Sequence, residues 1–86
     1  KSKYMLSKAT PLMTIYKEKD ESEFEQFMKQ NENENIQRIK KDIFKNIDFC
    51  INEDKWIMIN KENAPKIHFV IYHEKLITAI KTFLLS

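Results

Sequence analysis

No glycine occurs in the 86 residues of this chain. Phosphate-binding loops, dinucleotide fingerprints and nucleophile elbows need residues without a Cβ, either where the backbone approaches a ligand or where it turns sharply. The sequence therefore excludes the enzyme classes built on those motifs. Asparagine and aspartate tolerate positive φ next best. We accordingly expect them at the turns, where the chain offers Asn31, Asn33, Asn52, Asp54, Asn60 and Asn63.

The length predicts a single domain over residues 1–86, because a chain of this size can form one hydrophobic core and not two. Cys50 is the only cysteine, so neither an intrachain disulfide nor a cysteine-based zinc site is expected, and a cytoplasmic location is favoured. No run of about 18 apolar residues is present to span a membrane. Abundant lysine, isoleucine and asparagine suggest an AT-rich bacterial, plasmid or phage genome.

The first third of the chain predicts a short helix, a short strand and a longer helix. Pro11 disfavours helix at the residue before it, which limits the first helix to residues 3–9. The β-favouring run Thr14–Tyr16 predicts a strand over residues 12–16. A helix then begins at Asp20, which forms a capping-box pattern with Glu23. Its apolar side is expected to consist of Phe24, Phe27 and Met28.

Residues 34–47 form the clearest amphipathic pattern. An apolar stripe of isoleucines recurs at helical spacing, at Ile36, Ile39, Ile43 and Ile47. The opposite side is polar and basic, with Gln37, Arg38, Lys41 and Lys45. The pattern predicts a second helix whose exposed side carries positive charge.

The second half changes to an extended pattern and then back to a helical one. A strand is expected around Phe49 and Ile51, and the apolar runs 56–59 and 67–72 predict a β-hairpin with a polar tip at residues 60–66. A terminal helix is expected over about residues 73–86. Its apolar side is unusually extensive for so small a domain.

This order of elements resembles that of the winged helix-turn-helix family, although no sequence motif accompanies it. The resemblance predicts an α+β domain in which helix, strand, helix and recognition helix are followed by a β-hairpin wing and a C-terminal helix. It implies binding to double-stranded DNA by a non-catalytic accessory or regulatory protein. Residues 34–47 would be the recognition helix, and residues 1–8 would form a basic N-terminal arm.

The resemblance also assigns the predicted binding residues. On the recognition helix they are Gln37, Arg38, Lys41 and Lys45, and on the wing they are Lys61, Asn63 and Lys66. Arginine and glutamine can bond to base edges, whereas lysine more often neutralises phosphate. The terminal helix predicts a homodimer through Leu76, Ile80, Phe83 and Leu84, because so apolar a helix end seldom faces water.

Other interpretations remain open. A helix with an apolar and a charged side is also typical of any surface helix. The acidic residues Asp20, Glu21, Glu23 and Glu25 would repel phosphate if they faced DNA. The chain is therefore alternatively a protein–protein interaction or dimerisation module, such as a regulatory inhibitor. A third alternative is the sensor domain of a larger regulator.

Neither catalysis nor a metal or other cofactor is expected. His68 and His73 lie across the end of a predicted strand without sharing one face, and nothing completes a metal site. The carboxylates form a solvated face with no visible means of separating their pKa values. Cys50 is expected to be a buried strand residue and Trp56 a core residue.

Overall fold

The computed structural model describes residues 12–86, which form one antiparallel sheet with a helix on each side. The strands are β1 (Met13–Lys17), β2 (Gln37–Ile39), β3 (Ile47–Asn52), β4 (Trp56–Lys61) and β5 (Ile67–Ile71). Their order across the sheet is β1-β5-β4-β3-β2. A short 3-10 turn, η1 (Glu18–Asp20), leads from β1 into α2 (Glu21–Gln30), and α3 (Glu74–Leu85) follows β5.

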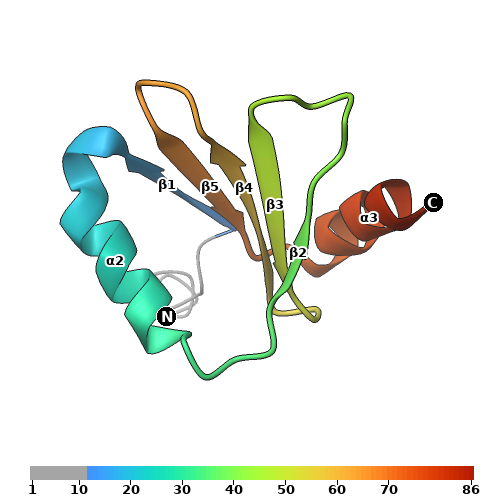
Figure 1. The fold of residues 1–86 in the computed structure, drawn as a ribbon. Coiled ribbons are helices and arrows are strands. Elements are labelled where there is room, and N and C mark those ends of the chain that lie inside the picture. Colours follow the sequence, from blue (N-terminus) through green and yellow to red (C-terminus); the bar gives the residue numbers. More distant parts are fainter. Residues whose placement is uncertain (1–11) are drawn as a thin grey trace, which may run out of the picture.

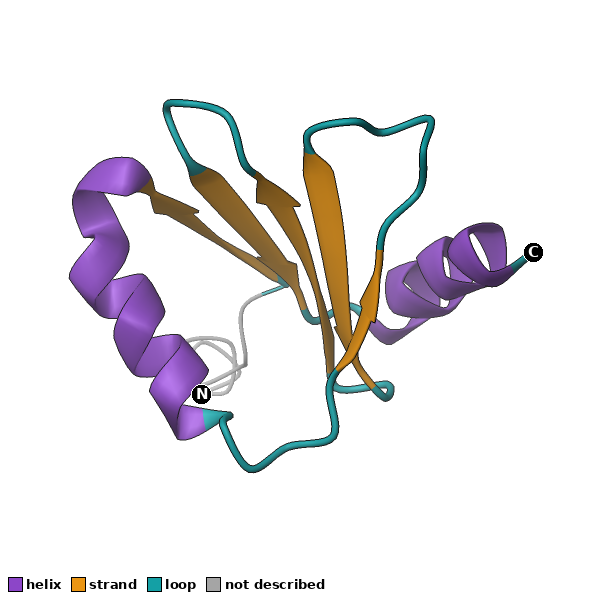
Figure 2. Ribbon diagram, viewed as in Figure 1, coloured by secondary structure: helices purple, strands orange, loops and turns teal. Residues whose placement is uncertain are grey.

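The two helices cover opposite sides of the sheet (Figure 2). Successive side chains of a strand point to opposite faces, and the alternation in β3, β4 and β5 therefore divides the core into two parts. Cys50, Met58 and Val70 lie on the α2 side. On the α3 side, the buried residues are Phe49, Ile51, Ile57, Ile71, Ile77 and Leu84.

The meander from β3 to β5 follows the sequence pattern closely. The predicted hairpin corresponds to β4 and β5, which pair from Ile57–Ile71 to Lys61–Ile67. The expected burial of Cys50 and Trp56 is confirmed, since they are 2% and 4% exposed. The predicted strand at 12–16 and the helices near 20–30 and 73–86 correspond to β1, α2 and α3.

The prediction of a winged-helix fold is wrong. Residues 34–47 do not form a helix: they contain the short edge strand β2 and a loop that leads to β3. The isoleucine stripe is therefore not one surface. Ile36 packs on the α2 side and Ile39 on the α3 side, while Ile43 is 73% exposed. Isoleucine is β-branched and favours strands, and pairing of Gln37–Ile39 with Phe49–Ile51 outweighs the helical spacing.

Two local predictions also need correction. Asp20 is the N-cap of α2, yet its side chain makes no capping bond there, and its Oδ2 instead accepts a hydrogen bond of 3.5 Å from the backbone N–H of Lys17. Within residues 12–86, positive φ occurs at Glu53 (48°), in the turn between β3 and β4, rather than at an asparagine or aspartate. The predicted helix at 3–9 and the basic arm at 1–8 lie outside the described residues.

Candidate functional site

A row of buried polar side chains crosses the sheet beneath α2. Asp48 is paired with Asn60 in the register of β3 and β4, and Asn60 with His68 in that of β4 and β5. The three residues are 9%, 7% and 9% exposed. Because burying polar groups is costly unless they are hydrogen-bonded, their partners decide what this row can do.

Each of the three residues has a hydrogen-bond partner in the row or beside it. Asn60 Oδ1 lies 2.8 Å from His68 Nδ1, and Asn60 Nδ2 donates to Cys50 Sγ at 3.7 Å. The ring of Phe24 stacks on His68 with centroids 3.6 Å apart. His68 Nε2 lies 3.5 Å from Glu21 Oε1, and neither of these two buried atoms makes a hydrogen bond in the described residues.

A cavity of about 430 Å³ lies beside this row. Phe24 and Met28 of α2 line one side of it, and Cys50 and Met58 of the sheet line the other. At its rim Arg38 donates a 2.8 Å hydrogen bond to Asp48, which raises the pKa of the guanidinium.

The polar row does not provide an activated nucleophile. Burial raises the pKa of the Cys50 thiol, and the neighbouring Asp48 charge raises it further, so the thiol remains protonated near neutral pH. The group that contacts Cys50 Sγ is the side-chain amide of Asn60, which cannot act as a base toward the thiol. No cluster of three or more potential metal ligands occurs in residues 12–86. The hydrogen bonds of the row instead join β3, β4 and β5, while Phe24 of α2 stacks on His68.

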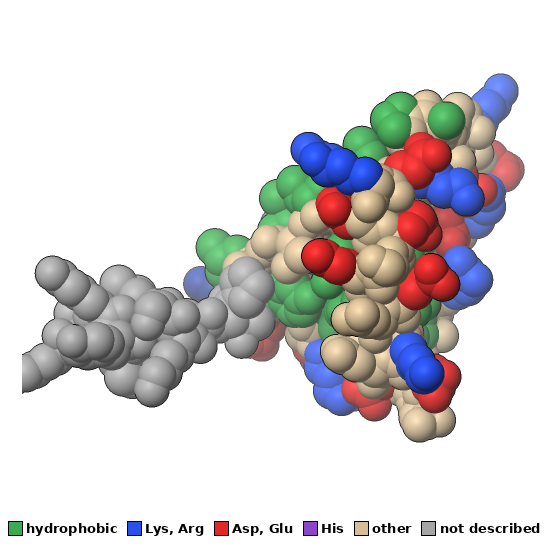
Figure 3. All heavy atoms as spheres, turned by 90° about the vertical axis from the view of Figure 1, so that its left-hand side faces the viewer, with side chains coloured by type: hydrophobic (Ala, Val, Ile, Leu, Met, Phe, Trp, Pro, Cys, Tyr) green, Lys and Arg blue, Asp and Glu red, His purple; other side chains and the backbone are tan. Residues whose placement is uncertain are grey.

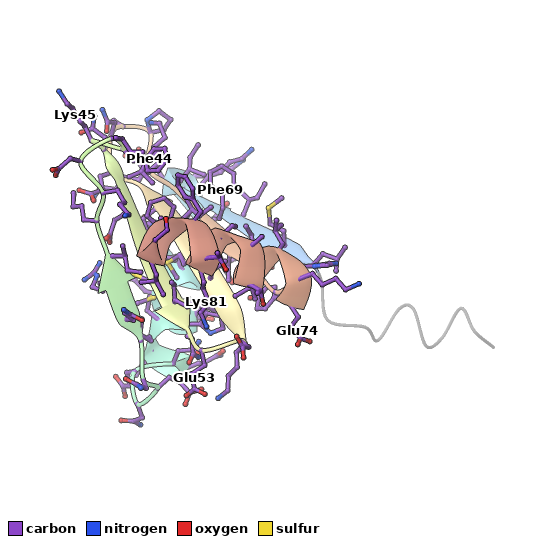
Figure 4. The ribbon with its side chains drawn as sticks, turned by 90° about the vertical axis from the view of Figure 1, so that its right-hand side faces the viewer. Phe44, Lys45, Glu53, Phe69, Glu74 and Lys81 are labelled. Atoms are coloured by element: carbon purple, nitrogen blue, oxygen red, sulfur yellow. The ribbon has the colours of Figure 1, made fainter. Side chains whose placement is uncertain are left out.

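Lysines gather at one end of the sheet, where β1 ends and the β2–β3 and β4–β5 loops meet. Glu62 N donates to Asn46 O at 2.9 Å, and Lys40 pairs with Glu62 at 2.9 Å, which holds the two loops together. Figure 4 shows Lys45 at this end of the sheet and Glu53 at the other. We call this region the basic end; its lysines are Lys17, Lys19, Lys40, Lys41, Lys45, Lys61 and Lys66.

The basic end has an excess of positive charge. It contains four acids, Glu18, Asp20, Asp42 and Glu62, against the seven lysines. Of these lysines, Lys40 alone forms an ion pair within residues 12–86. Lys61 is less available than the others, because its Nζ donates to the carbonyl oxygens of Asn63 and Pro65 at 3.0 and 3.2 Å.

The predicted DNA-binding residues separate into two groups. Five lie at the basic end, on loops and strand ends rather than on a recognition helix: Lys41, Lys45, Lys61, Asn63 and Lys66. Gln37 and Arg38 lie in the edge strand β2, and Arg38 is engaged with Asp48. Acidic side chains lie along α2, where Figure 3 shows them in red.

Exposed apolar side chains are concentrated on β1 and α3. Within residues 12–86, the large hydrophobic residues that are at least 43% exposed are Leu12 just before β1, Met13 and Ile15 in β1, Leu76, Phe83 and Leu85 in α3, and Ile43 in the β2–β3 loop. None of them comes from α2, β3, β4 or β5. Since α3 packs on Phe49, Ile51 and Ile57, it leaves the apolar residues of β1 uncovered.

The residues predicted for a dimer interface differ in environment. Leu76 and Phe83 are 46% and 52% exposed and can contact a partner. Ile80 is partly buried against the core, and Leu84 is 2% exposed. Leu84 is therefore a core residue, because the helical period turns it toward the sheet together with Ile77.

A groove of about 530 Å³ runs between β1 and the first half of α3. Its lining is nearly all apolar and comprises Leu12, Met13, Ile71, Leu76 and Ala79, with His73 and Lys75 at one end. The side chain of His73 caps α3, accepting a hydrogen bond from Leu76 N at 3.3 Å. We call the surface formed by Leu12, Met13, Ile15, Leu76 and Ala79 the β1–α3 surface.

Sequence reasoning missed this surface and the polar row. A signal for the row was present, because Asp48, Asn60 and His68 interrupt otherwise apolar strands and meet when the hairpins are aligned. The contribution of β1 to the apolar surface depends on its place at the sheet edge, next to β5. The order of the strands cannot be deduced from the run Met13–Tyr16 itself.

The chain matches no protein-family model, no curated protein and no solved structure. No helix within residues 12–86 is long and apolar enough to cross a membrane. Function must therefore be argued from the surfaces themselves.

Proposed function

We propose that this domain acts by non-catalytic protein–protein interaction and assembles as a homodimer through the β1–α3 surface. The observation that carries the proposal is the concentration of exposed large hydrophobic residues on β1 and α3, around a groove whose lining is nearly all apolar. Contiguous apolar patches of this kind on small domains mark interaction sites. The buried state of Cys50 and the bonded polar row give no comparable support for catalysis.

Leu76 offers the most direct test, because it is 46% exposed and lines the groove. Complete burial of a leucine side chain contributes about 1.5–3 kcal/mol, so covering the exposed half contributes roughly 1 kcal/mol per copy. Two copies in a symmetric dimer contribute about 2 kcal/mol, or roughly a thirtyfold change in Kd. Leu76→Lys should weaken self-association by at least this factor.

The assay is sedimentation equilibrium over a range of protein concentrations. Leu85→Lys is the matched control, since Leu85 lies on the same helix and is 55% exposed but does not line the groove. We expect a monomer–dimer equilibrium for the wild type, a large loss for Leu76→Lys and little change for Leu85→Lys. A wild-type chain that remains monomeric at all concentrations would refute the proposal.

A second candidate function is binding of a polyanion, with duplex DNA as the test case, at the basic end. It is favoured by the excess of seven lysines over four acids on adjoining loops and strand ends. It does not use a recognition helix. Lysines that neutralise phosphates release counterions, and binding should therefore weaken steeply with salt.

Titration of a short DNA duplex at several salt concentrations tests this candidate. Replacing both Lys41 and Lys45 with alanine should reduce the magnitude of the salt slope by roughly two, one for each lost phosphate contact. A Lys75→Ala variant is the control, because Lys75 lies on α3 outside the basic end. Equal losses in both variants, or no binding at low salt, would remove this candidate.

A further inference from the structure

The two edges of the sheet are not equally protected against pairing with another strand. β2 is three residues long and carries Arg38, with Lys40 directly after it. Short edge strands and charged side chains are features by which proteins avoid edge-to-edge association. β1 is five residues long, and its first four residues, Met13–Tyr16, are uncharged. Within residues 12–86, the β1 edge therefore lacks the protection that the β2 edge has.

The register identifies which backbone groups of β1 face outward. Tyr72 N donates to Leu12 O at 2.8 Å, so Leu12 bonds toward the β5 side of β1. In an antiparallel ladder, residues alternate between those that bond to the neighbouring strand and those that do not. Thr14 and Tyr16 then bond to β5, while the N–H and C=O groups of Met13, Ile15 and Lys17 point away from the sheet. The Lys17 N–H also lies 3.5 Å from Asp20 Oδ2, which is at the long limit of a hydrogen bond.

We infer that β1 pairs antiparallel with β1 of a second copy of this chain, with Ile15 opposite Ile15 of the second copy. This inference rests on the homodimer proposed above and specifies how its two copies meet. In this register Met13 lies opposite Lys17 of the second copy. Ile15 therefore exchanges two N–H···O bonds with its copy, Met13 pairs with Lys17 as the Lys17 N–H leaves its long contact with Asp20 Oδ2, and the two sheets become one.

The same register suits the side chains. Met13, Ile15 and Lys17 point to the α3 side, as their alternation with Tyr16 of the α2 side requires. Opposite Met13, the Lys17 side chain avoids Lys17 of the second copy, so no like charges face each other across the new pair. Ile15 contacts its own symmetry mate, and the two β1–α3 surfaces become continuous about the two-fold axis.

Other registers use the edge less fully. Centring the pair on Thr14 or on Tyr16 leaves one of the three outward residues without a partner among Met13–Lys17. A centre between two residues would place outward groups opposite inward ones, which an antiparallel ladder does not allow. The register centred on Ile15 gives each of the three outward residues a partner, with the Lys17 N–H exchanging Asp20 Oδ2 for the second copy.

Disulfide trapping tests this register in the full chain. Residues in a hydrogen-bonded antiparallel pair have Cα atoms about 5.5 Å apart, within the range of about 4.4–6.8 Å that disulfides span. Oxidised Ile15→Cys should therefore form a covalent dimer. Thr14→Cys is the matched control, because Thr14 lies opposite Tyr16 of the second copy and points to the other side of the sheet. Native Cys50 is buried and contributes little background.

We expect Ile15→Cys to cross-link at least tenfold faster than Thr14→Cys. Equal rates, or no covalent dimer from Ile15→Cys in a chain that sedimentation shows to be dimeric, would overturn β1 pairing while leaving the homodimer intact. A monomeric wild type would overturn both. The two failures are therefore distinguishable.

Amide hydrogen exchange of the wild type gives a second test that needs no variant in β1. The Ile15 amide should be protected at concentrations where the chain is dimeric and should exchange faster on dilution. Rapid exchange of this amide in the dimer would overturn the inference. So would protection that persists in the monomer, because another part of the chain would then cover the edge.

Discussion

The variant Leu84→Ala tests which side chains of α3 belong to the core of this domain. Leu84 is 2% exposed and belongs to the cluster that joins α3 to the sheet, whereas the adjacent Phe83 is 52% exposed. The two residues follow one another on the same helix. If α3 is placed as described, truncating the smaller Leu84 side chain must lower the free energy of unfolding far more than truncating the larger Phe83 side chain.

The magnitude follows from burial. Replacing a fully buried leucine with alanine removes its transfer free energy and leaves a cavity, which together lower the free energy of unfolding by about 2–5 kcal/mol. The total free energy of unfolding of a domain of this size is roughly 4–13 kcal/mol. For a loss of about 3 kcal/mol, Tm should fall by roughly 12–24 °C. Phe83→Ala should lower the free energy of unfolding by about 1 kcal/mol or less.

Urea denaturation monitored by Trp56 fluorescence measures both variants. Trp56 is the only tryptophan and is 4% exposed on the α2 side, away from both substitutions, so it reports unfolding of the whole domain. Leu84→Met conserves volume and should cost less than about 1.5 kcal/mol. Equal losses for Leu84→Ala and Phe83→Ala would refute the placement of α3.

Further predictions concern Cys50, Glu34 and Glu53. Because burial raises the pKa of the Cys50 thiol, a thiol reagent should modify it slowly in the native protein and rapidly in urea; fast native reaction would contradict its burial. A hydrogen bond from Lys55 is the chief cause that lowers the pKa of Glu34. The pair therefore stabilises the fold at pH values above the unfolded-state pKa of this carboxyl group. This contribution is lost as the pH falls through the folded-state pKa. Glu34→Gln should therefore flatten the acid side of the stability–pH profile, and an unchanged profile would disprove the linkage. Glu53→Asn should raise the free energy of unfolding by up to about 1 kcal/mol in thermal denaturation, since asparagine tolerates positive φ better; destabilisation would count against this backbone conformation.

The strands of the meander could be predicted because local pattern and tertiary environment agree there. In β3, β4 and β5, alternating side chains supply the two halves of the core, so each face carries buried apolar residues. The β-branched and aromatic content of these runs favours strands regardless of their neighbours. α2 and α3 were predictable for the same reason, because each places one apolar side on the sheet.

The segment from 34 to 47 shows where local pattern fails. Its isoleucines occur at helical spacing, but β2 forms through pairing with β3. That pairing depends on contacts distant in sequence, and tertiary contacts override weak helix propensity. The winged-helix interpretation depended on this one segment, so the fold assignment failed with it.

The candidate sites were predictable only in part. Five of the predicted DNA-binding residues do lie at one end of the molecule, although the loops that bring them there were assigned to a helix and a wing. Leu76 and Phe83 were correctly expected to have an exposed apolar side, whereas Leu84 was not distinguished from them. The part played by β1 required knowledge of the strand order, which sequence periodicity does not contain.

Isotope-filtered NMR on a mixture of labelled and unlabelled chains tests the central claim most directly, because it detects only contacts between copies. Association through β1 and the start of α3 predicts intermolecular NOEs that link the side chains of Ile15, Met13 and Leu76 to the other copy. Such NOEs from Phe83 and Ile43 instead, or none at concentrations near millimolar, would contradict it.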